Sequence, residues 1–357
     1  MDNLSHLRKK IDGLDDEILR LLNERARLVL DIGREKAKLS SVPHVPERER
    51  EILERLTASN PGPFPNDGIR TLYREIFAVS VALESPTTVV YLGPEATYAH
   101  QASQRYFGSG VSLVPLGTIP AIFREVESDR ATFGLVPVEN SIEGMVSHTL
   151  DLLMEFDLKI CGEVFLKITH YLISSANTLG KVNRIYSHPQ ALAQCRQWIE
   201  HNLPRAELVE LTSTARAAER AREEEGAAAV ASLLAAELYG LSVLARGIED
   251  NPHNYTRFLV IGKKPPAPSG NDKTSILFSV KDAPGALFKA LSPFAEQKVN
   301  LTKIESRPSK KKPWEYVFFV DMAGHLEEEA VRKALEELWA DAVDLRVLGS
   351  YPRGETA

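Results

Sequence analysis

The segment SPTTVVYLGPEATYAH, residues 85–100, is the point at which the pattern of apolar residues along the chain changes its period. Before this segment, apolar residues recur every three or four positions, which predicts amphipathic helices. From Thr88 onward, short apolar runs such as TVVYL predict strands that alternate with helices. Working outward from this junction divides the chain into a helical part, an α/β part and, beyond a second linker, a small C-terminal part.

The N-terminal part, residues 1–85, is predicted to be entirely helical. No proline interrupts the sequence between Met1 and Val42, and at about 1.5 Å per residue this helix would be roughly 50 Å long. A domain of this size is too small to cover such a helix, so we expect a second copy of the chain to pack against it, as a homodimer or higher homo-oligomer. Its apolar positions follow a sustained three-and-four spacing: Leu4, Leu7, Ile11, Leu14, Ile18, Leu21, Leu28, Ile32 and Leu39.

The middle part, residues 88–264, has the alternation of an α/β fold with a largely parallel sheet. Turn and cap residues cluster directly after the predicted strands, in GPEATY, VENSIEG, SHPQ and TSTAR, and open α/β sheets bind ligands at that end of their strands. After the linker KKPPAPSGNDK, residues 272–351 follow the order strand, helix, strand, strand, helix, strand. That order is the βαββαβ pattern of ferredoxin-like α+β domains.

Composition narrows the classes of function. The 357 residues carry a formal net charge of -6, which argues against non-specific binding of nucleic acid. The two cysteines, Cys161 and Cys195, form neither a disulfide framework nor a metal-binding pattern, so we expect a reducing, cytoplasmic location. The charged, helix-periodic N-terminus does not resemble a signal peptide, and no apolar run approaches the ~18 residues that a membrane helix needs.

One cation lies on the apolar stripe of the first helix. Arg25 is between Leu21 and Leu28, where a charge is costly unless an anion pairs with it. Lys36 is about 20° around the helix from Arg25, so the two side chains could hold one small dianion, whereas Arg8 is about 100° away and could serve only the pocket of a partner chain. The plainer alternative is a coiled-coil module whose Arg and Lys side chains reach out to solvent.

Residues 4–84 resemble the helical chorismate mutase family. The similarity is carried by LRKKIDGLDDEILRLLNERARLVLDIGREKAK at residues 7–38, by RERE at 48–51 and by the Ser-x-x-x-Glu pattern of the last helix. The resemblance implies that Arg8 reaches the substrate from a partner subunit and that Arg25 clamps a carboxylate. It further implies that Lys36 lies near the breaking ether bond, that Arg48 and Glu49 act as a pair in which Glu49 binds the substrate hydroxyl, and that Ser80 and Glu84 complete the pocket.

These residue types suit a Claisen rearrangement, which needs no metal, cofactor or nucleophile. It needs a flexible dianion, here chorismate, held in a compact conformation with charge stabilised at the departing oxygen. Glu84 can help only when it is protonated. Family members often carry Asp-Pro-x-Arg-Glu before the second helix, whereas this chain has Val45 in place of the Asp. This difference removes one expected contact to the substrate hydroxyl and could weaken the mutase.

Residues 88–264 resemble prephenate dehydratases throughout, in YLGPEATYAHQA, VPVENSIEGMVSHTLDLL, YSHPQALAQCRQW, TSTARAA and NYTRF. Such domains are similar to two-lobed, periplasmic-binding-protein-like folds with the ligand between the lobes. The resemblance implies Thr256 as the acid for the leaving hydroxyl of prephenate and Arg257 as a carboxylate anchor, beside Phe258. It further places in the pocket Thr97, Asn140, Ser141, Gln190 and Thr214.

The acid is open to two interpretations. An aliphatic hydroxyl is a weak acid, so Thr256 could instead orient the leaving group while Glu139 or His188 supplies the proton. The first motif also differs from the usual Gly-Pro-x-Gly-Thr of the family, because Ala96 replaces the second glycine and could hinder a close backbone approach.

The C-terminal part resembles ACT regulatory domains, which implies that L-phenylalanine is an effector. Gly285 lets a ligand approach the start of a helix whose amides suit a carboxylate. The resemblance implies a phenylalanine site made by Gly285, Ala286 and Leu287 together with Glu305, Ser306 and Arg307 of the ESRP motif.

Taken together, the three parts predict a bifunctional enzyme of phenylalanine biosynthesis that converts chorismate to prephenate and prephenate to phenylpyruvate. One alternative is a non-catalytic amino-acid sensor with a helical dimerisation module, although such a module would not need Arg25, Lys36, Arg48 and Glu49. The other alternative is a dehydratase whose mutase domain has weakened.

Overall fold

The computed structural model describes residues 3–39, 46–84, 87–108, 110–309 and 316–354. Contacts between residues divide the chain into two compact units, residues 1–87 with 107–112 and the remaining residues up to 357. Among the described helices, none is long and apolar enough to cross a membrane.

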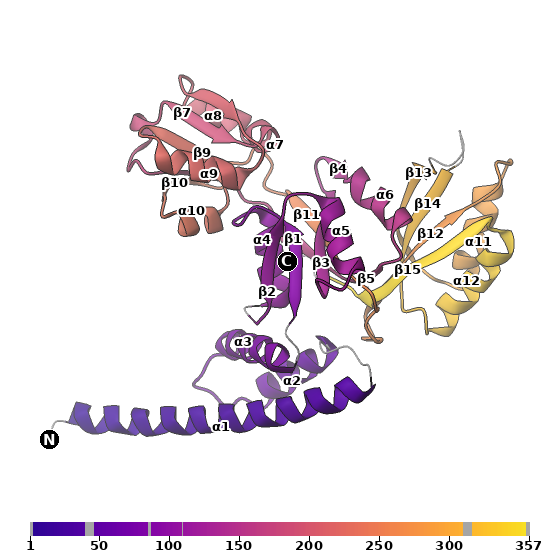
Figure 1. The fold of residues 1–357 in the computed structure, drawn as a ribbon, viewed down its shortest axis with the longest axis horizontal. Coiled ribbons are helices and arrows are strands. Elements are labelled where there is room, and N and C mark those ends of the chain that lie inside the picture. The colour runs from indigo at the N-terminus through magenta and orange to yellow at the C-terminus, as the bar shows by residue number, and fades with distance from the viewer. Residues whose placement is uncertain (1–2, 40–45, 85–86, 109, 310–315, 355–357) are drawn as a thin grey trace. The chain divides into compact units, whose positions relative to one another are not determined.

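The first unit contains three helices, α1 (Asn3–Leu39), α2 (Pro46–Ala58) and α3 (Asn66–Glu84), and α3 packs against both others (Figure 1). Val29 of α1 and Phe77 of α3 are buried, and Ala78 of α3 is buried beside Gly108 and Gly110. The apolar stripe of α1 is not covered by any of the described residues. Half or more of the surface of several of its leucines and isoleucines is exposed, namely Leu4, Ile11, Leu14, Ile18, Leu21 and Leu28.

The α/β part contains two sheets, in agreement with the two-lobed fold that the resemblance implies, but both sheets are mixed and not largely parallel as the strand–helix alternation had indicated. The first has the strand order β2-β1-β3-β11-β5, in which β1 and β3 are parallel and β11 is antiparallel to both of its neighbours. Its strands are β1 (Thr88–Leu92), β2 (Ser112–Leu116), β3 (Phe133–Asn140), β5 (Lys159–Lys167) and β11 (Tyr255–Gly262), with the short β4 (Gly144–Met145) on β3. The accompanying helices are α4 (Tyr98–Phe107), α5 (Ile119–Glu127) and α6 (Ser147–Glu155).

The second sheet has the order β10-β6-β9-β7-β8. Its strands are β6 (Tyr171–Ser174), β7 (Arg184–Ser187), β8 (Glu207–Glu210), β9 (Ala227–Ala231) and β10 (Ser242–Arg246). The accompanying helices are α7 (Pro189–Gln194), α8 (Arg196–Asn202), α9 (Thr214–Glu223) and α10 (Leu233–Tyr239). A 3-10 turn, η1 (Leu179–Lys181), precedes β7. The chain crosses from one sheet to the other twice, between β5 and β6 and between β10 and β11. The run GEVFLKITHYLI is therefore two strands in two lobes, not one strand.

The C-terminal part contains β12 (Asp272–Ser279), α11 (Ala286–Glu296), β13 (Leu301–Pro308), β14 (Tyr316–Ala323), α12 (Glu329–Asp341) and β15 (Asp344–Pro352). The four strands form an antiparallel sheet in the order β13-β14-β12-β15. The helices α11 and α12 pack against each other, and their apolar faces share a core with the sheet that includes Phe278, Phe294 and Leu338.

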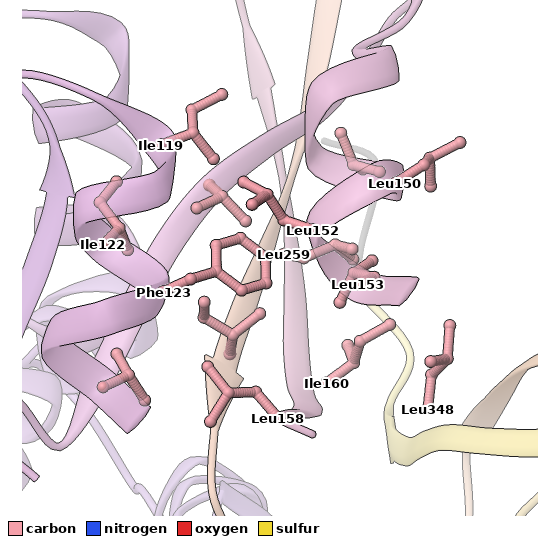
Figure 2. Close-up of a cluster of buried hydrophobic side chains, with 14 of the residues drawn as sticks. Ile119, Ile122, Phe123, Leu150, Leu152, Leu153, Leu158, Ile160, Leu259 and Leu348 are labelled. Carbon is pink, nitrogen blue, oxygen red and sulfur yellow. The ribbon is translucent and has the colours of Figure 1, made fainter. Parts of the chain in front are cut away.

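The first lobe and the C-terminal sheet share a hydrophobic core. Leu348 of β15 belongs to the same buried cluster as Leu153 of α6 and Ile160 of β5 (Figure 2). The backbones of β15 and β5 also approach closely, because a Cβ atom on Gly349 would lie 2.2 Å from the carbonyl oxygen of Ile160. Any larger residue at this position would separate the two sheets.

Candidate functional site

In the helical unit, three of the residues singled out by sequence lie together. Arg25 donates a hydrogen bond from Nη1 to the hydroxyl of Ser80, and its Cζ lies 5.6 Å from the centre of the Phe77 ring. Burial raises the pKa of Glu49 to about 7, and the nearby charge of Arg25 opposes that rise. A half-buried cation, a hydroxyl and a carboxyl group are therefore gathered from all three helices.

The other residues expected in the mutase site are not brought to this cluster within the described residues. The Arg48 side chain is exposed and pairs with Glu51 at 2.8 Å. Arg8 is 17 residues from Arg25 along α1, which is about 25 Å at the helical rise. The side chains of Lys36 and Glu84, and Val45 as a whole, lie outside the described residues.

A pocket with a volume of about 320 Å³ lies between the two lobes of the α/β part. Its wall combines Leu92 and Thr97 of the first lobe with His188 and Thr214 of the second lobe. Seven of the residues expected in the dehydratase site line it, namely Thr97, Asn140, His188, Gln190, Thr214, Thr256 and Phe258. Pockets of this size hold small organic ligands.

Three residues expected in the pocket lie elsewhere. Glu139 is on β3 next to Asn140, but its carboxylate pairs with Lys303 of β13 at 2.5 Å. Ser141 is exposed, where its hydroxyl donates to the carbonyl oxygen of His253 and accepts from the backbone N–H of Tyr255. Neither residue belongs to the pocket wall.

Arg257 is the third exception, and its side chain takes part in a buried ion cluster. It lies between Thr256 and Phe258 on β11, and successive side chains of a strand point to opposite faces. Its guanidinium contacts Glu163 of β5 at 2.7 Å and Asp321 of β14 at 2.7 Å. The expected role of Arg257 as a carboxylate anchor is therefore not supported by its position.

The ion cluster includes two more groups from the C-terminal part. Lys273 of β12 lies 2.8 Å from Glu163, and the hydroxyl of Tyr351 accepts a hydrogen bond from Arg257 at 3.1 Å. Burial works against the charge of Arg257, yet Asp321, Tyr351 and Glu163 together raise its pKa above the usual range. Two cations and two carboxylates thus neutralise one another between β5 and β11 on one side and the C-terminal sheet on the other.

Hydrogen bonds fix how the pocket hydroxyls can act. Thr256 accepts a hydrogen bond from Nδ2 of Asn140 at 2.9 Å, which leaves its own hydrogen for another acceptor. The Thr97 hydroxyl instead contacts the carbonyl oxygens of Leu92 at 3.1 Å and Pro94 at 3.0 Å, so its hydrogen is used within the turn before α4. Of these two hydroxyls, Thr256 is the one that is available as a donor.

Helix starts and uncharged groups surround the pocket. His188 caps α7 by accepting the backbone N–H of Gln190 at its Nδ1, at 3.3 Å, and Ser213 caps α9. No Lys, Arg, Asp or Glu occurs among the described residues of the wall. An anion in this pocket would therefore be held by neutral donors and by helix dipoles.

Sequence reasoning missed Tyr98, His170 and Gln194, which also line the pocket. Burial lowers the pKa of His170, while its hydrogen bond to Gln194 and the charge of Glu249 oppose that shift. Gln194 could have been found from its spacing, because it lies four residues after Gln190 on the same short helix. His170 lies between β5 and β6, where the chain crosses from one lobe to the other. The sequence GEVFLKITHYLI looks like one strand, so this crossing and its histidine were not predicted.

The residues expected to bind phenylalanine lie on two elements of the C-terminal part. Gly285 precedes α11 with a φ of 79°, a left-handed conformation that favours glycine, and Ala286 and Leu287 begin the helix. Glu305, Ser306 and Arg307 are on β13. Arg307 contacts Ser147 at 2.8 Å and Asp151 at 3.4 Å, both on α6 of the first lobe.

Ala96 adopts the left-handed conformation that glycine would take more easily, with a φ of 63°. Its methyl group is fully buried, and its backbone N–H and carbonyl are bonded to His100 and Ser232. The turn is therefore formed in spite of the alanine, at the cost of some backbone strain.

Comparisons with known proteins agree with this division of the chain. Family models match residues 7–85 as chorismate mutase type II, residues 89–266 as prephenate dehydratase and residues 274–340 as an ACT domain. The chain is similar to the bifunctional chorismate mutase/prephenate dehydratases of Aquifex aeolicus, with 54% identity, and Pseudomonas aeruginosa, with 46% identity. These alignments cover 99% of this chain and 99% and 98% of the two relatives.

A solved structure of a prephenate dehydratase from Arthrobacter aurescens, in complex with L-Phe, is also similar. It superposes with a TM-score of 0.70 at 35% identity, over 75% of this chain and 90% of that chain.

The fold and its sites thus define an enzyme in which a helical isomerase precedes a two-lobed lyase and an ACT domain. The chain belongs to the family of bifunctional chorismate mutase/prephenate dehydratases. It rearranges chorismate to prephenate and removes water and carbon dioxide from prephenate.

Proposed function

We propose that prephenate reacts in the pocket between the two lobes and that the Thr256 hydroxyl donates a hydrogen bond to the hydroxyl that leaves. The observation that carries this proposal is the bond from Asn140 to Thr256, which commits the oxygen as an acceptor and frees the hydrogen. Thr256 then orients the leaving group, since an aliphatic hydroxyl is a poor acid.

Of the two proton sources considered, His188 is supported better than Glu139. Glu139 pairs with Lys303 outside the pocket, whereas His188 lines it. Because Nδ1 of His188 accepts the N–H of Gln190, Nε2 carries the hydrogen in the neutral ring. To act as an acid, His188 would first take up a proton at Nδ1, which displaces the cap to Gln190, and would then pass a proton from Nε2 to the leaving hydroxyl.

The uncharged wall also suits the loss of carbon dioxide. Prephenate carries two carboxylates, and a carboxylate that is not paired with a cation is poorly stabilised when water is excluded. Loss of that group as CO₂ moves its electrons into the ring while the hydroxyl departs with a proton. Neutral donors at the starts of α4 and α9 are available to hold the carboxylate that remains.

Substitutions of Thr256 test this proposal on purified protein supplied with prephenate. Thr256→Ser keeps a hydroxyl and is expected to retain most of the activity, whereas Thr256→Val has nearly the same shape and is expected to lose about 100-fold or more in kcat. A highly active Thr256→Val variant would remove the hydroxyl from the mechanism.

We propose in addition that the mutase site is completed by a second copy of the chain. Arg25, Ser80 and Glu49 lie together in one chain, but Arg8 is too far along α1 to join them. The uncovered apolar stripe of α1 supports a second α1 as the occupant, because an exposed row of this length is unusual for a monomer. Arg8 of the partner would then supply the missing cation.

The third proposal is that L-phenylalanine, bound at the ACT domain, inhibits the dehydratase. The similar dehydratase of Arthrobacter aurescens was solved in complex with L-Phe. In this chain β13, which carries Glu305, Ser306 and Arg307, contacts the first lobe through Lys303–Glu139 and Arg307–Asp151. Glu139 adjoins the pocket residue Asn140, so a ligand that shifts β13 would act next to the pocket.

One assay examines both activities and their control. Purified protein is supplied with chorismate, and prephenate and phenylpyruvate are followed with and without phenylalanine. We expect both compounds to form and phenylalanine to lower phenylpyruvate selectively. Formation of neither compound would favour a non-catalytic sensor, and dehydration of added prephenate without use of chorismate would indicate a weakened mutase.

A further inference from the structure

The dehydratase pocket is backed by a row of side-chain amides whose orientations are fixed by the backbone. The row begins at Asn140, whose Oδ1 accepts the backbone N–H groups of Ile142 at 3.0 Å and Glu143 at 3.1 Å. A backbone N–H can only donate, so the oxygen of Asn140 must face these two groups. Its Nδ2 must therefore face the opposite way.

The next two members of the row follow from this first orientation. Nδ2 of Asn140 lies 2.8 Å from Asn254, so the atom of Asn254 that it meets must be the oxygen. The amide nitrogen of Asn254 then faces Gln194 at 2.9 Å, and the atom of Gln194 that receives it must also be the oxygen. Reversing any one amide would bring two donors or two acceptors together.

A histidine secures the far end of the row. Nε2 of His170 lies 3.0 Å from the same oxygen of Gln194, so the hydrogen of the neutral ring is on Nε2. The oxygen of Gln194 thus accepts two hydrogen bonds, while its Nε2 is shielded from solvent and has no hydrogen-bond partner in the described part of the chain. Buried donors are usually satisfied, and Gln194 belongs to the wall of the ligand pocket.

We infer that Gln194 is a substrate-binding residue whose Nε2 donates to a carboxylate oxygen of prephenate, and that Asn254 is the positioning residue that gives Gln194 this orientation. Asn254 is fully buried and is not part of the wall, so it acts only through its neighbours. The fixed orientations leave two groups free to donate hydrogen bonds to a ligand, namely the hydroxyl of Thr256 and the amide Nε2 of Gln194. This inference rests on the proposed dehydratase pocket. It adds a hydrogen-bond donor for a carboxylate of prephenate in a pocket whose described wall contains no Lys or Arg.

Two substitutions of Gln194 separate a contact with substrate from a purely structural role. Gln194→Glu keeps an oxygen to accept from His170 and Asn254, but it replaces the donor by a second acceptor. Gln194→Leu removes both. If Gln194 binds a carboxylate, both variants should lose about 10- to 100-fold in kcat/KM for prephenate, with Gln194→Glu recovering as the pH falls and the introduced carboxyl gains a hydrogen to donate.

The matched control is Gln197→Leu, which makes the same change on the exposed face of the next helix and should leave the kinetics unchanged. A Gln194→Glu variant with the kcat/KM of the unmodified chain would overturn the inference, since a structural role needs only the acceptor. If the unmodified chain did not dehydrate prephenate, the proposed function itself would be rejected. This outcome differs from an active chain in which Gln194→Glu has no effect, which would reject only the role of Gln194.

Asn254→Asp provides a second test that does not alter the pocket wall. The introduced carboxylate can accept from Asn140 but cannot donate to Gln194, so the amide of Gln194 is expected to turn and present its oxygen to the pocket. We expect a rise of about tenfold or more in KM for prephenate with a smaller change in kcat, and partial recovery at low pH. An unchanged KM in a folded variant, checked by thermal unfolding, would show that Asn254 does not set the orientation of Gln194.

Discussion

At the scale of single residues, the raised pKa of Glu49 has a consequence for stability. Burial raises this pKa to about 7, with Arg25 opposing the shift, so the folded state holds the proton more tightly than the unfolded state does. The stabilisation is fully present below the ordinary pKa of a glutamate, ~4.3, and is lost as the pH rises through about 7.

We therefore expect Glu49→Gln to remove this dependence. The unfolding temperature of the helical unit should fall between pH 5 and pH 8 in the unmodified chain and fall less in the variant, measured by thermal unfolding. Glu54→Gln, at an exposed position on the same helix, is the control. Equal slopes for Glu49→Gln and the unmodified chain would contradict the assignment.

Most residues of the dehydratase pocket could be predicted because they follow strands or begin helices. Thr97, Asn140, His188 and Thr214 all do so. Arg257 could also have been excluded from the sequence, since a strand cannot direct Thr256, Arg257 and Phe258 to one face. The partners of Arg257 could not have been predicted, because they come from sequence positions far away in another sheet.

At the scale of elements, β11 connects the pocket to the C-terminal sheet. One face of the strand carries Thr256 and Phe258 in the pocket, and the other carries Arg257 in the ion cluster. Removing one member of a buried ion pair leaves its partner uncompensated, at a cost of about 3–5 kcal/mol.

Arg257→Met is accordingly expected to lower the free energy of unfolding of the larger unit by about 3–5 kcal/mol, measured by urea unfolding. Arg246→Met, at an exposed position, should change it by less than about 0.5 kcal/mol. A neutral effect of Arg257→Met would mean that Glu163 and Asp321 find compensation elsewhere.

The uncovered stripe of α1 leads to a prediction about shared mutase sites. If each site joins Arg25 of one chain to Arg8 of the other, then Arg8→Ala and Arg25→Ala should each be inactive alone. Co-expression should restore about one quarter of the mutase activity, because half of the dimers are mixed and each mixed dimer has one intact site. No recovery would indicate that both arginines serve the same chain's site, or that chains do not pair through α1.

At the scale of the whole molecule, the two units have separate cores. None of the four buried clusters that hold the α/β and C-terminal parts together includes a residue of α1, α2 or α3. Residues 88–357 alone should therefore dehydrate prephenate with a kcat within about twofold of the full chain, as prephenate dehydratases that align with only 75% of this chain suggest. Aggregation or loss of activity on truncation would show that the helical unit supports the rest.

The order of the three parts was predictable because each has its own periodicity and the Pro-rich run KKPPAPSGNDK marks the second boundary. The division of the α/β part into two lobes was implied by the resemblance and not by the residue pattern, because the first crossing lies inside GEVFLKITHYLI, which looks like a single strand. The core that β15 shares with the first lobe could not be predicted either. The alternation of apolar residues along β15 is the same whether Leu348 packs against a helix of its own part or against another sheet.

The absence of charged residues from the described wall of the dehydratase pocket has a consequence for ionic strength. Added salt screens attraction between exposed or partly exposed charges, but it acts weakly on hydrogen bonds from neutral groups. Because Arg25 is proposed to bind chorismate, the KM of the mutase should rise with salt, whereas the KM of the dehydratase should stay nearly constant. Salt would then slow the first reaction and spare the second, so that prephenate is consumed as fast as it forms.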